Sequence, residues 1–536
     1  MTAPSRDLLT RFRNYFSVKP ATTDAEREAI YRIRYRVYCD EFGYEPKERF
    51  PSQMETDELD AVATHLLITH LASGMPAACM RICPASDQDQ PLSLPFEKRC
   101  EESLDLAAAK RFSAPRGQMC EASRFAVDSA FRRRPGECAS PIGEIASLSL
   151  SDHEQRTFPL LTLVLTFAAV AMAELLERPL MYAVMDPFLP RLLKRSGLVF
   201  VRIGRDADYH GTRAVYVTDT RFAVHRLDKE MQTLYWWVHD QLAPNMLPAN
   251  ASPRDARWIA DGSTRAADIS ARNPAPGPFE IIEQSSGLLS SFRSYFSVQA
   301  ATTDAEREAA YRIRYRVYCD EFGYEPRERF PSRMETDEFD AVATHLLINH
   351  FATDMPAGCM RICPASDQGQ PVPLPLEKCC HESLDLAATR FSAPREQICE
   401  ASRFAVDSAF RRRSGERLSR FGEIASLSLS DHERRTFPLL TLVLMFTGVA
   451  TAELLERPFM YALMEPFLPR LLKRFGLVFV RMGRDVNYHG TRAVYITDTR
   501  FLVHRLDKEM EALYRWVHDQ LASSTRRKGS VLAMAG

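Results

Sequence analysis

Hydrophobic and polar residues in the first part of the chain follow two different periods, which predicts a domain built from both strands and helices. In one segment apolar side chains recur every three to four residues, as on one face of a helix. In other segments they form short or alternating runs bounded by turn residues, as in strands. The expected elements are a strand at 15–22, a helix at 24–42 capped by Asp24, a hairpin of 64–72 and 77–83, and a strand at 120–128.

The most apolar stretch, Phe158 to Ala173, is predicted to be a buried helix and not a membrane span. It ends at Glu174 and is shorter than the roughly 20 residues that a span needs. Ser151–Glu154 before it has the pattern of a capping box. The remaining expected elements are an insertion with one short helix at 84–115, the apolar helix at 151–177, strands at 180–185, 198–204 and 213–219, and helices at 187–197 and 221–242. This order predicts a mixed α/β domain.

The whole pattern occurs twice. Leu8–Leu242 returns as Leu288–Leu521, with an offset of 280 residues up to Lys110, which has no counterpart, and of 279 afterwards. A unit of about 235 residues is large enough to bury a core of its own. The segment between the copies is rich in Pro, Ala, Ser and Asn and lacks periodicity. We therefore expect a first domain at 1–243, a flexible linker at 244–287, a second domain at 288–522 and a disordered tail at 523–536.

Composition narrows the function classes. Of the residues, 45% are hydrophobic and 26% are charged, and 69 basic against 70 acidic residues give a net charge of −1. Proteins that bind nucleic acid usually have an excess of basic residues, so this composition argues against nucleic-acid binding. The twelve cysteines contain no Cys-x-x-Cys pair, which favours reduced thiols and argues against a metal site. Because the first residues are charged where a signal peptide needs an apolar run, we expect a cytoplasmic protein whose only membrane contact is through a lipid product.

Charged residues recur with fixed spacing in one order along each copy. In the first copy the motifs are Arg34-x-x-x-Tyr38, Glu55-x-Asp57-x-Leu59-Asp60, Arg81 and Glu121-Ala-Ser-Arg124-Phe125. They resemble the signature of the acyl-homoserine-lactone synthases, and residues 185–217 resemble N-acyl amino acid synthases and the acyltransferases of exosortase/PEP-CTERM systems. The resemblance implies tandem GCN5-related N-acyltransferase folds, each a mixed central sheet flanked by helices. It also implies transfer of a fatty acyl group from a thioester to the amine of an amino acid or similar small acceptor, with no permanently bound cofactor.

Within this resemblance, Glu121 is expected to accept the proton of the attacking amine. Either Arg81 or Arg124 is expected to hold the carboxylate of the acceptor. Tyr209 or His210 is expected to protonate the departing thiolate. Backbone amides of the central strand are expected to hold the thioester oxygen, and the slot beside the apolar helix to take the acyl tail.

Asp57 and Asp60 are expected to order Arg34 and the loop over the site. The candidate catalytic residues are Glu121, Tyr209 and His210 in the first copy, and Glu400, Tyr488 and His489 in the second. The candidate substrate-binding residues are Arg34, Tyr38, Asp57, Asp60, Arg81 and Arg124, with Arg314, Tyr318, Asp337, Asp340, Arg361 and Arg403 in the second copy.

Two departures from the related families bear on the substrates. The synthases carry a tryptophan soon after the first motif, but the residues that closely follow it here include Tyr44 and no tryptophan, which argues against S-adenosylmethionine as the amine donor. The loop after the central strand contains one glycine, Gly136, so it offers less backbone for cradling a CoA pyrophosphate. Acyl-carrier protein is therefore the favoured donor over acyl-CoA, and arginines are its candidate contacts: Arg132, Arg133 and Arg134, and Arg411, Arg412 and Arg413.

Several alternatives remain open at this point. Arg34 and Tyr38 fit a solvated helix face equally well in spacing, and His210 fits an ordinary loop histidine. Glu121 and Arg124 lie on opposite faces of a regular strand, so one of them is structural unless a bulge turns it. For the whole protein, the alternatives are an acyl-homoserine-lactone synthase that uses S-adenosylmethionine and a non-catalytic tandem module that binds lipid or carrier protein.

Overall fold

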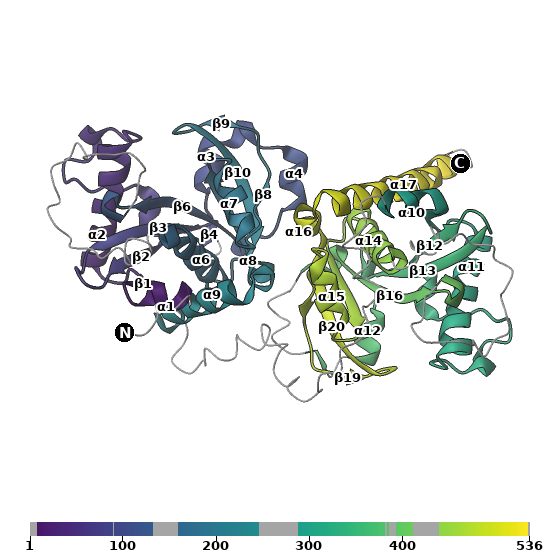
Figure 1. The fold of residues 1–536 in the computed structure, drawn as a ribbon. Helices are drawn as coiled ribbons and strands as arrows, with labels where there is room; N and C mark the ends of the chain where they lie inside the picture. The colour runs from purple at the N-terminus through teal and green to yellow at the C-terminus, as the bar shows by residue number, and fades with distance from the viewer. Residues whose placement is uncertain are drawn as a thin grey trace. The chain divides into compact units, whose positions relative to one another are not determined.

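The chain folds into two units, each with one copy of the repeat (Figure 1). The computed structural model describes residues 8–88, 90–131, 159–245, 288–380, 383–384, 393–410 and 439–533. By their internal contacts the units are Met1–Asp261 and Gly262–Gly536. The linker predicted at 244–287 lies outside the described residues from 246 onward.

One mixed sheet forms the centre of the first unit, in the order β1-β2-β3-β6-β7-β10-β8, with β9 paired to β10. Neighbouring strands are antiparallel except β6 and β7, which run parallel. The predicted mixed sheet and hairpin are confirmed. The strands are β1 (Phe16–Pro20), β2 (Thr64–His70), β3 (Pro76–Pro84), β6 (Met119–Val127), β7 (Leu180–Met185), β8 (Val201–Arg202), β9 (Ala207–Asp208) and β10 (Thr212–Asp219).

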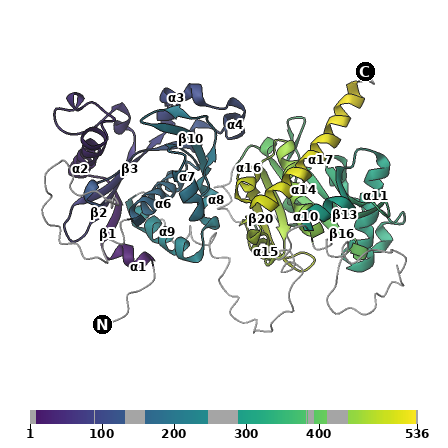
Figure 2. The same cartoon turned by 45° about the horizontal axis from the view of Figure 1, so that its top comes forward.

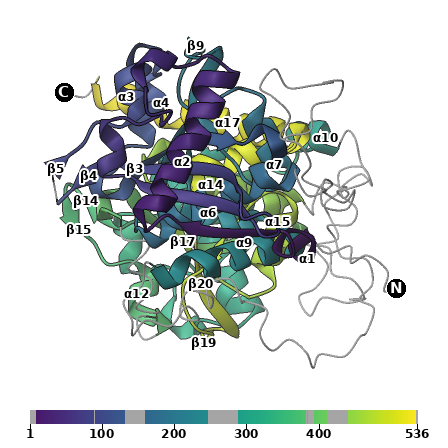
Figure 3. The ribbon, with the colours of Figure 1, turned by 90° about the vertical axis from the view of Figure 1, so that its left-hand side faces the viewer.

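Helices cover both faces of this sheet because successive side chains of a strand point to opposite sides. Leu67 of β2 packs with Ile30 and Ile33 of α2, whereas Leu66 and Ile68 belong to the core with α6. Figure 3 shows α2 on the near side of β3 and α6 behind it, and α6 and α9 lie side by side (Figure 2). The helices are α1 (Leu8–Arg13), α2 (Asp24–Tyr35), α6 (Pro159–Leu175), α7 (Leu189–Arg195), α8 (Thr220–Ala223) and α9 (Lys229–Leu242).

The helix that supplies the first motif differs from the prediction at both ends. Thr23, not Asp24, is its N-cap, because the Thr23 hydroxyl accepts from the Glu26 amide and the Glu26 carboxylate accepts from the Thr23 amide. The α-helix ends at Tyr35, and a π-helix, Arg36–Glu41, continues it. A π-helix turn shifts the side chains that follow it and is often found at functional sites.

The insertion holds more structure than the single short helix expected. It contains α3 (Pro95–Arg99), α4 (Leu106–Arg111) and a hairpin of β4 (Ser86–Asp87) and β5 (Gln90–Pro91). Elements this short have too few turns for hydrophobic periodicity to be visible. They depend instead on long-range contacts, such as the bond from the Phe96 amide at the start of α3 to Glu121 on β6.

The second unit repeats this arrangement, with the sheet order β11-β12-β13-β16-β17-β20-β18 and β19 paired to β20. The helix α17 continues to Ala533, so the tail predicted as disordered at 523–536 is helical over most of its length. Among the described residues, no helix is both long enough and apolar enough to cross a bilayer. The main elements are β11 (Phe296–Ala300), α11 (Asp304–Arg314), β12 (Thr344–His350), β13 (Met355–Pro364), α12 (Pro375–Cys379), β16 (Ile398–Val406), α14 (Leu439–Leu454), β17 (Phe459–Met464), α15 (Leu468–Arg474), β18 (Val480–Arg481), β19 (Val486–Asn487), β20 (Thr491–Asp498), α16 (Thr499–Leu502) and α17 (Lys508–Ala533).

Candidate active site

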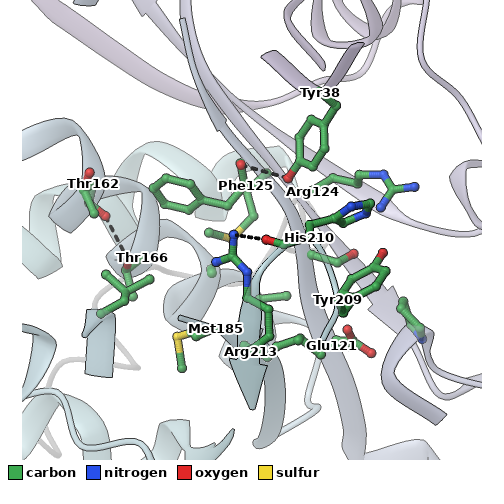
Figure 4. Close-up of a pocket in the computed structure, with 18 of the residues that line it drawn as sticks. Tyr38, Glu121, Arg124, Phe125, Thr162, Thr166, Met185, Tyr209, His210 and Arg213 are labelled. Carbon is green, nitrogen blue, oxygen red and sulfur yellow. Dashed lines mark hydrogen bonds between the residues drawn. The ribbon is translucent and has the colours of Figure 1, made fainter. Parts of the chain in front are cut away.

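A pocket of about 350 Å³ lies where β6 and β7 stop pairing. The two strands pair only as far as Ala122 and Ala183, although β6 continues to Val127 and β7 to Met185. Residues of both strands line the pocket, and Figure 4 shows charged and aromatic side chains at one end and α6 at the other. The polar lining residues include Tyr38, Glu121, Arg124, Tyr209, His210 and Arg213, and the apolar ones include Met80, Val127, Ala169, Met181, Met185, Leu193 and Phe200.

Glu121 lies in the wall of this pocket and is almost fully buried, with 1% of its surface exposed. Burial disfavours the charged carboxylate and raises the pKa of Glu121 to about 8, although the Phe96 amide, 2.8 Å from Oε2, acts in the opposite direction. A carboxyl group with a pKa near neutrality can accept and return a proton at physiological pH. Glu121, which the sequence predicts to be the base, therefore lies in a pocket and has a pKa suited to exchanging a proton near neutral pH.

A β-bulge brings Arg124 to the same pocket as Glu121. Arg81 pairs with Ser123 and Cys79 pairs with Ala126, so two residues of β6 oppose the single residue between Cys79 and Arg81 on β3. Arg124 has a φ of 52°, which is uncommon for a residue other than glycine. The bulge resolves the alternatives that strand periodicity left open, because both side chains line the pocket.

Behind the pocket, three arginines and three carboxylates form a buried ion network. Asp60 accepts from Arg34 Nη1 at 2.7 Å and from Arg81 Nη1 at 2.6 Å. Asp57 also accepts from Arg81 Nη2 at 2.8 Å, and Glu55 joins Arg34 to Arg124. The arginines hold the pKa values of Asp57 and Asp60 below their usual range. The positive and negative charges balance, so each can stay ionised without water.

This network changes the roles expected for two arginines. Arg34 is fully buried and Arg81 is 1% exposed, and both guanidinium groups are occupied by carboxylates of the protein itself. Neither lines the pocket, so neither is placed to hold a substrate carboxylate, and the solvated helix face considered for Arg34 is wrong. Arg124 does line the pocket, and its guanidinium lies 5.5 Å from the ring centre of Tyr38.

Tyr209 and His210 lie at the polar end of the pocket, on the loop before β10. The His210 ring stacks on Tyr44 with 4.6 Å between ring centres. Burial lowers the pKa of His210, so at neutral pH the imidazole is uncharged and donates from only one ring nitrogen. Within the described part of the protein, His210 Nε2 is buried without a hydrogen-bond partner. Tyr38 has a structural contact, because its hydroxyl donates to the Phe125 carbonyl at 3.0 Å.

The sequence reasoning did not single out all of the residues that the structure brings together here. Glu55 is fully buried at the centre of the network, and its place in the second motif was an available signal. Arg99 and Arg213 line the pocket, and the Arg99 guanidinium lies 5.3 Å from the Tyr209 ring centre. No motif marked Arg99, which comes from the insertion, whereas Arg213 lies three residues after His210 within the 185–217 segment, and that position was an available signal.

The second copy preserves this arrangement with some differences. Glu400 is 2% exposed, its Oε2 accepts from the Leu376 amide at 2.8 Å, and burial raises its pKa to about 8. The network and the pocket residues Arg403, Tyr488 and His489 also recur. Cys379 replaces Arg99 in the pocket wall. The remaining network residues are Arg314, Glu335, Asp337, Asp340 and Arg361, and Tyr318 donates to the Phe404 carbonyl at 3.0 Å.

The arginines expected to meet a carrier protein, Arg132–Arg134 and Arg411–Arg413, lie outside the described residues. In the described residues no group of three or more His, Cys, Asp or Glu side chains has an arrangement that could hold a metal ion.

Comparison with known proteins gives matches that agree with this fold. The acetyltransferase (GNAT) domain family model matches residues 33–139 and 313–420. An acyl-homoserine-lactone synthase from Pseudomonas amygdali pv. tabaci is 29% identical over 151 residues, which are 28% of this chain and 60% of the relative. The chain thus spans less than two thirds of that relative's length.

Two solved structures that match part of the chain are a CoA-dependent acyl-homoserine-lactone synthase, BjaI, with S-adenosylmethionine and isopentyl-CoA, and FeeM, an N-acyl amino acid synthase from uncultured soil microbes. BjaI is 17% identical, with 42% of this chain and 89% of BjaI covered and a TM-score of 0.29. FeeM is 16% identical, with 40% of this chain and 94% of FeeM covered and a TM-score of 0.26.

The family matches fall on both copies and include the β6 residues that line each pocket. Each copy of the repeat therefore carries a region that matches the acetyltransferase (GNAT) domain model, and the two matched regions stand in tandem along the chain.

Proposed function

We propose that each copy is an N-acyltransferase that moves a fatty acyl group from an acyl-carrier protein or acyl-CoA thioester to the amine of an amino acid or similar small acceptor. The observation that carries this proposal is the pocket between β6 and β7, in which a buried carboxyl group meets an apolar slot. A hydrocarbon chain gains from transfer into such a slot, and the reacting amine needs a proton acceptor beside it.

In the proposed reaction the acceptor's amine gives up a proton to Glu121 and attacks the thioester carbonyl carbon. A C–N bond forms and the C–S bond breaks. The leaving thiolate takes a proton from Tyr209 or His210, since a neutral imidazole can still donate its one N–H. That group is then reprotonated by the second proton that the nitrogen loses as the amide forms. Arg124 is the arginine of the motif that lines the pocket, so in this proposal it holds the acceptor's carboxylate.

A second candidate is synthesis of an acyl-homoserine lactone with S-adenosylmethionine as the amine donor. The curated relative is a synthase of this kind, and one similar structure holds both S-adenosylmethionine and an acyl-CoA. Tyr44 in place of the synthases' tryptophan argues against it. A link to an exosortase/PEP-CTERM system rests only on the resemblance of residues 185–217, and a cytoplasmic location rests on the thioester donors and the free cysteines.

Mass spectrometry of reaction products tests the proposal directly. The full-length protein would be incubated with acyl-carrier protein or acyl-CoA donors and a mixture of amino acids, and separately with S-adenosylmethionine. We expect N-acyl amino acids in the first mixture. Acyl-homoserine lactone in the second mixture alone would favour the second candidate. Tight donor binding without any product would instead support a non-catalytic tandem module.

If a carrier protein delivers the acyl group, reversing Arg132–Arg134 and Arg411–Arg413 to glutamate should raise the KM for acyl-carrier protein and weaken its salt dependence. Acyl-carrier proteins are acidic, and charges at the rim of an interface act mainly on encounter. Arg13→Glu, a reversal on the exposed surface of α1, is the control. An unchanged KM and salt response in the reversed variant would remove these arginines from the donor site.

A further inference from the structure

The two pockets share the proposed reacting residues, although Cys379 replaces Arg99 at the polar end, and they also differ at the ends formed by the apolar helix. Glu121, Arg124, Tyr209 and His210 all have identical counterparts that line the second pocket. The second pocket is smaller, however, at about 290 Å³ against about 350 Å³. The difference must therefore come from residues away from the reacting groups.

One substitution on the apolar helix places a larger side chain in the second pocket. Thr166 of α6 lines the first pocket, and its hydroxyl donates to the Thr162 carbonyl at 2.8 Å, so the short side chain is held against its own helix. The counterpart in α14 is Met445, which lines the second pocket. Methionine is longer and unbranched, and it fills apolar space readily.

A second substitution on the same helix fits the same change. Ala169 lines the first pocket, and its counterpart is Gly448. A Cβ atom added to Gly448 would lie 2.8 Å from the sulfur of Met360, which is closer than van der Waals contact allows. Met360 therefore packs against α14 in a space that the Ala169 methyl group takes in the first copy, and Met360 and Met445 both line the second pocket.

The lining of the two pockets agrees with a shorter second slot. Six residues around the apolar end of the first pocket have counterparts that, in the described part of the chain, do not line the second. Glu465 and Phe467 line the second pocket instead. The six in the first copy are Val127, Thr162, Ala169, Met181, Leu193 and Phe200, and their counterparts are Val406, Thr441, Gly448, Met460, Leu472 and Phe479.

We infer that Met445 closes the apolar end of the second pocket, so that the second copy transfers shorter acyl chains than the first. This inference rests on the proposed function, because it assigns the slot to the acyl chain. One protein then makes products of two chain lengths by the same chemistry, and Thr166 and Met445 determine the specificity. One methylene too many in an apolar pocket typically lowers kcat/KM by about 10- to 200-fold.

The test measures product chain length for the full-length protein with straight-chain acyl donors of increasing length. The wild type should show two length optima. Thr166→Met should lower the longer-chain products at least ~10-fold and leave the shorter ones, whereas Met445→Thr should remove the shorter optimum. The double variant Thr166→Met/Met445→Thr should regain both optima, because each copy then carries the other's residue at this position of the apolar helix. Two merely damaging substitutions would add their losses instead.

Ala168→Thr is the matched control. It places on α6 the residue found at the equivalent position of α14, Thr447, which is buried there with its hydroxyl on the Val443 carbonyl and does not line the described second pocket. This variant should keep the wild-type product profile. A profile that is the same in wild type, Thr166→Met and Met445→Thr would overturn the inference while leaving acyl transfer intact.

Binding of unreactive acyl thioethers of the same lengths separates this inference from the proposed function. If no donor is turned over but the affinity for long chains falls in Thr166→Met and rises in Met445→Thr, the pockets hold acyl chains as inferred and the proposed reaction is wrong. If the thioethers bind with no dependence on chain length in any variant, the inference fails.

Discussion

Replacing both Glu121 and Glu400 by glutamine should lower acyl transfer by about 10²- to 10⁴-fold, the usual cost of removing a general base. The amine is protonated at neutral pH and cannot attack until it loses that proton. Each glutamate is buried in its pocket with a pKa raised to about 8. The single variants should each retain the activity of the other copy, because the losses in separate sites add.

The pH dependence of kcat/KM distinguishes a general base from a residue that only stabilises the fold, because replacing a purely structural residue would leave this dependence unchanged. The base acts when ionised, so wild-type kcat/KM should rise with pH and level off above about pH 8, and the double variant should lack this rise. Turnover of the double variant close to that of the wild type, with an unaltered profile, would mean that another group deprotonates the amine.

Stability measurements control for loss of the fold. Burial raises the pKa of each glutamate above its value in the unfolded chain, so the folded state is favoured when the glutamate is protonated. This contribution to the free energy of unfolding is complete below about pH 4.5 and is lost as the pH rises towards about 8. Glutamine does not ionise and can still accept from the Phe96 amide. The double variant should therefore be at least as stable as the wild type at pH 8, as judged by thermal unfolding.

Replacing Arg34 and Arg314 by methionine should destabilise each unit by about 3–5 kcal/mol, because it leaves a buried carboxylate network short of one positive charge. Both side chains are at most 1% exposed, and both bind a buried glutamate and an aspartate. Methionine fills a similar volume, so the loss of charge and not a cavity dominates the change. Urea unfolding of the full-length protein measures the effect.

The matched control is Arg32→Ala with Arg312→Ala, on the same two helices. These arginines pair with Glu28 and Glu308, but both partners of each pair are about half exposed, and such pairs contribute about 0–1 kcal/mol. Equal destabilisation by the two sets of substitutions would show that the buried network is no stronger than a surface pair. It would also mean that the motif charges act on substrate and not on the fold.

The sequence by itself determined the repeat, the mixed α/β class and most of the element order. Hydrophobic periodicity is a local property, and long elements such as α6 and β6 contain enough residues to display it. The motif order also identified the charges that the fold brings together, including Glu121 and Arg124. Short elements such as β4, β5 and β9 escaped prediction because two residues are too few to display a period.

Only the tertiary structure decided what each charge does. Strand periodicity placed Glu121 and Arg124 on opposite faces, and the bulge against β3 brings both to the pocket. Arg34, Arg81 and Arg124 look equivalent in the sequence, and in the structure all three pair with buried carboxylates, but of the three only Arg124 also lines the described pocket. The difference between the two acyl slots was equally hidden, because a pocket's depth depends on side chains from several elements and on the free space between them.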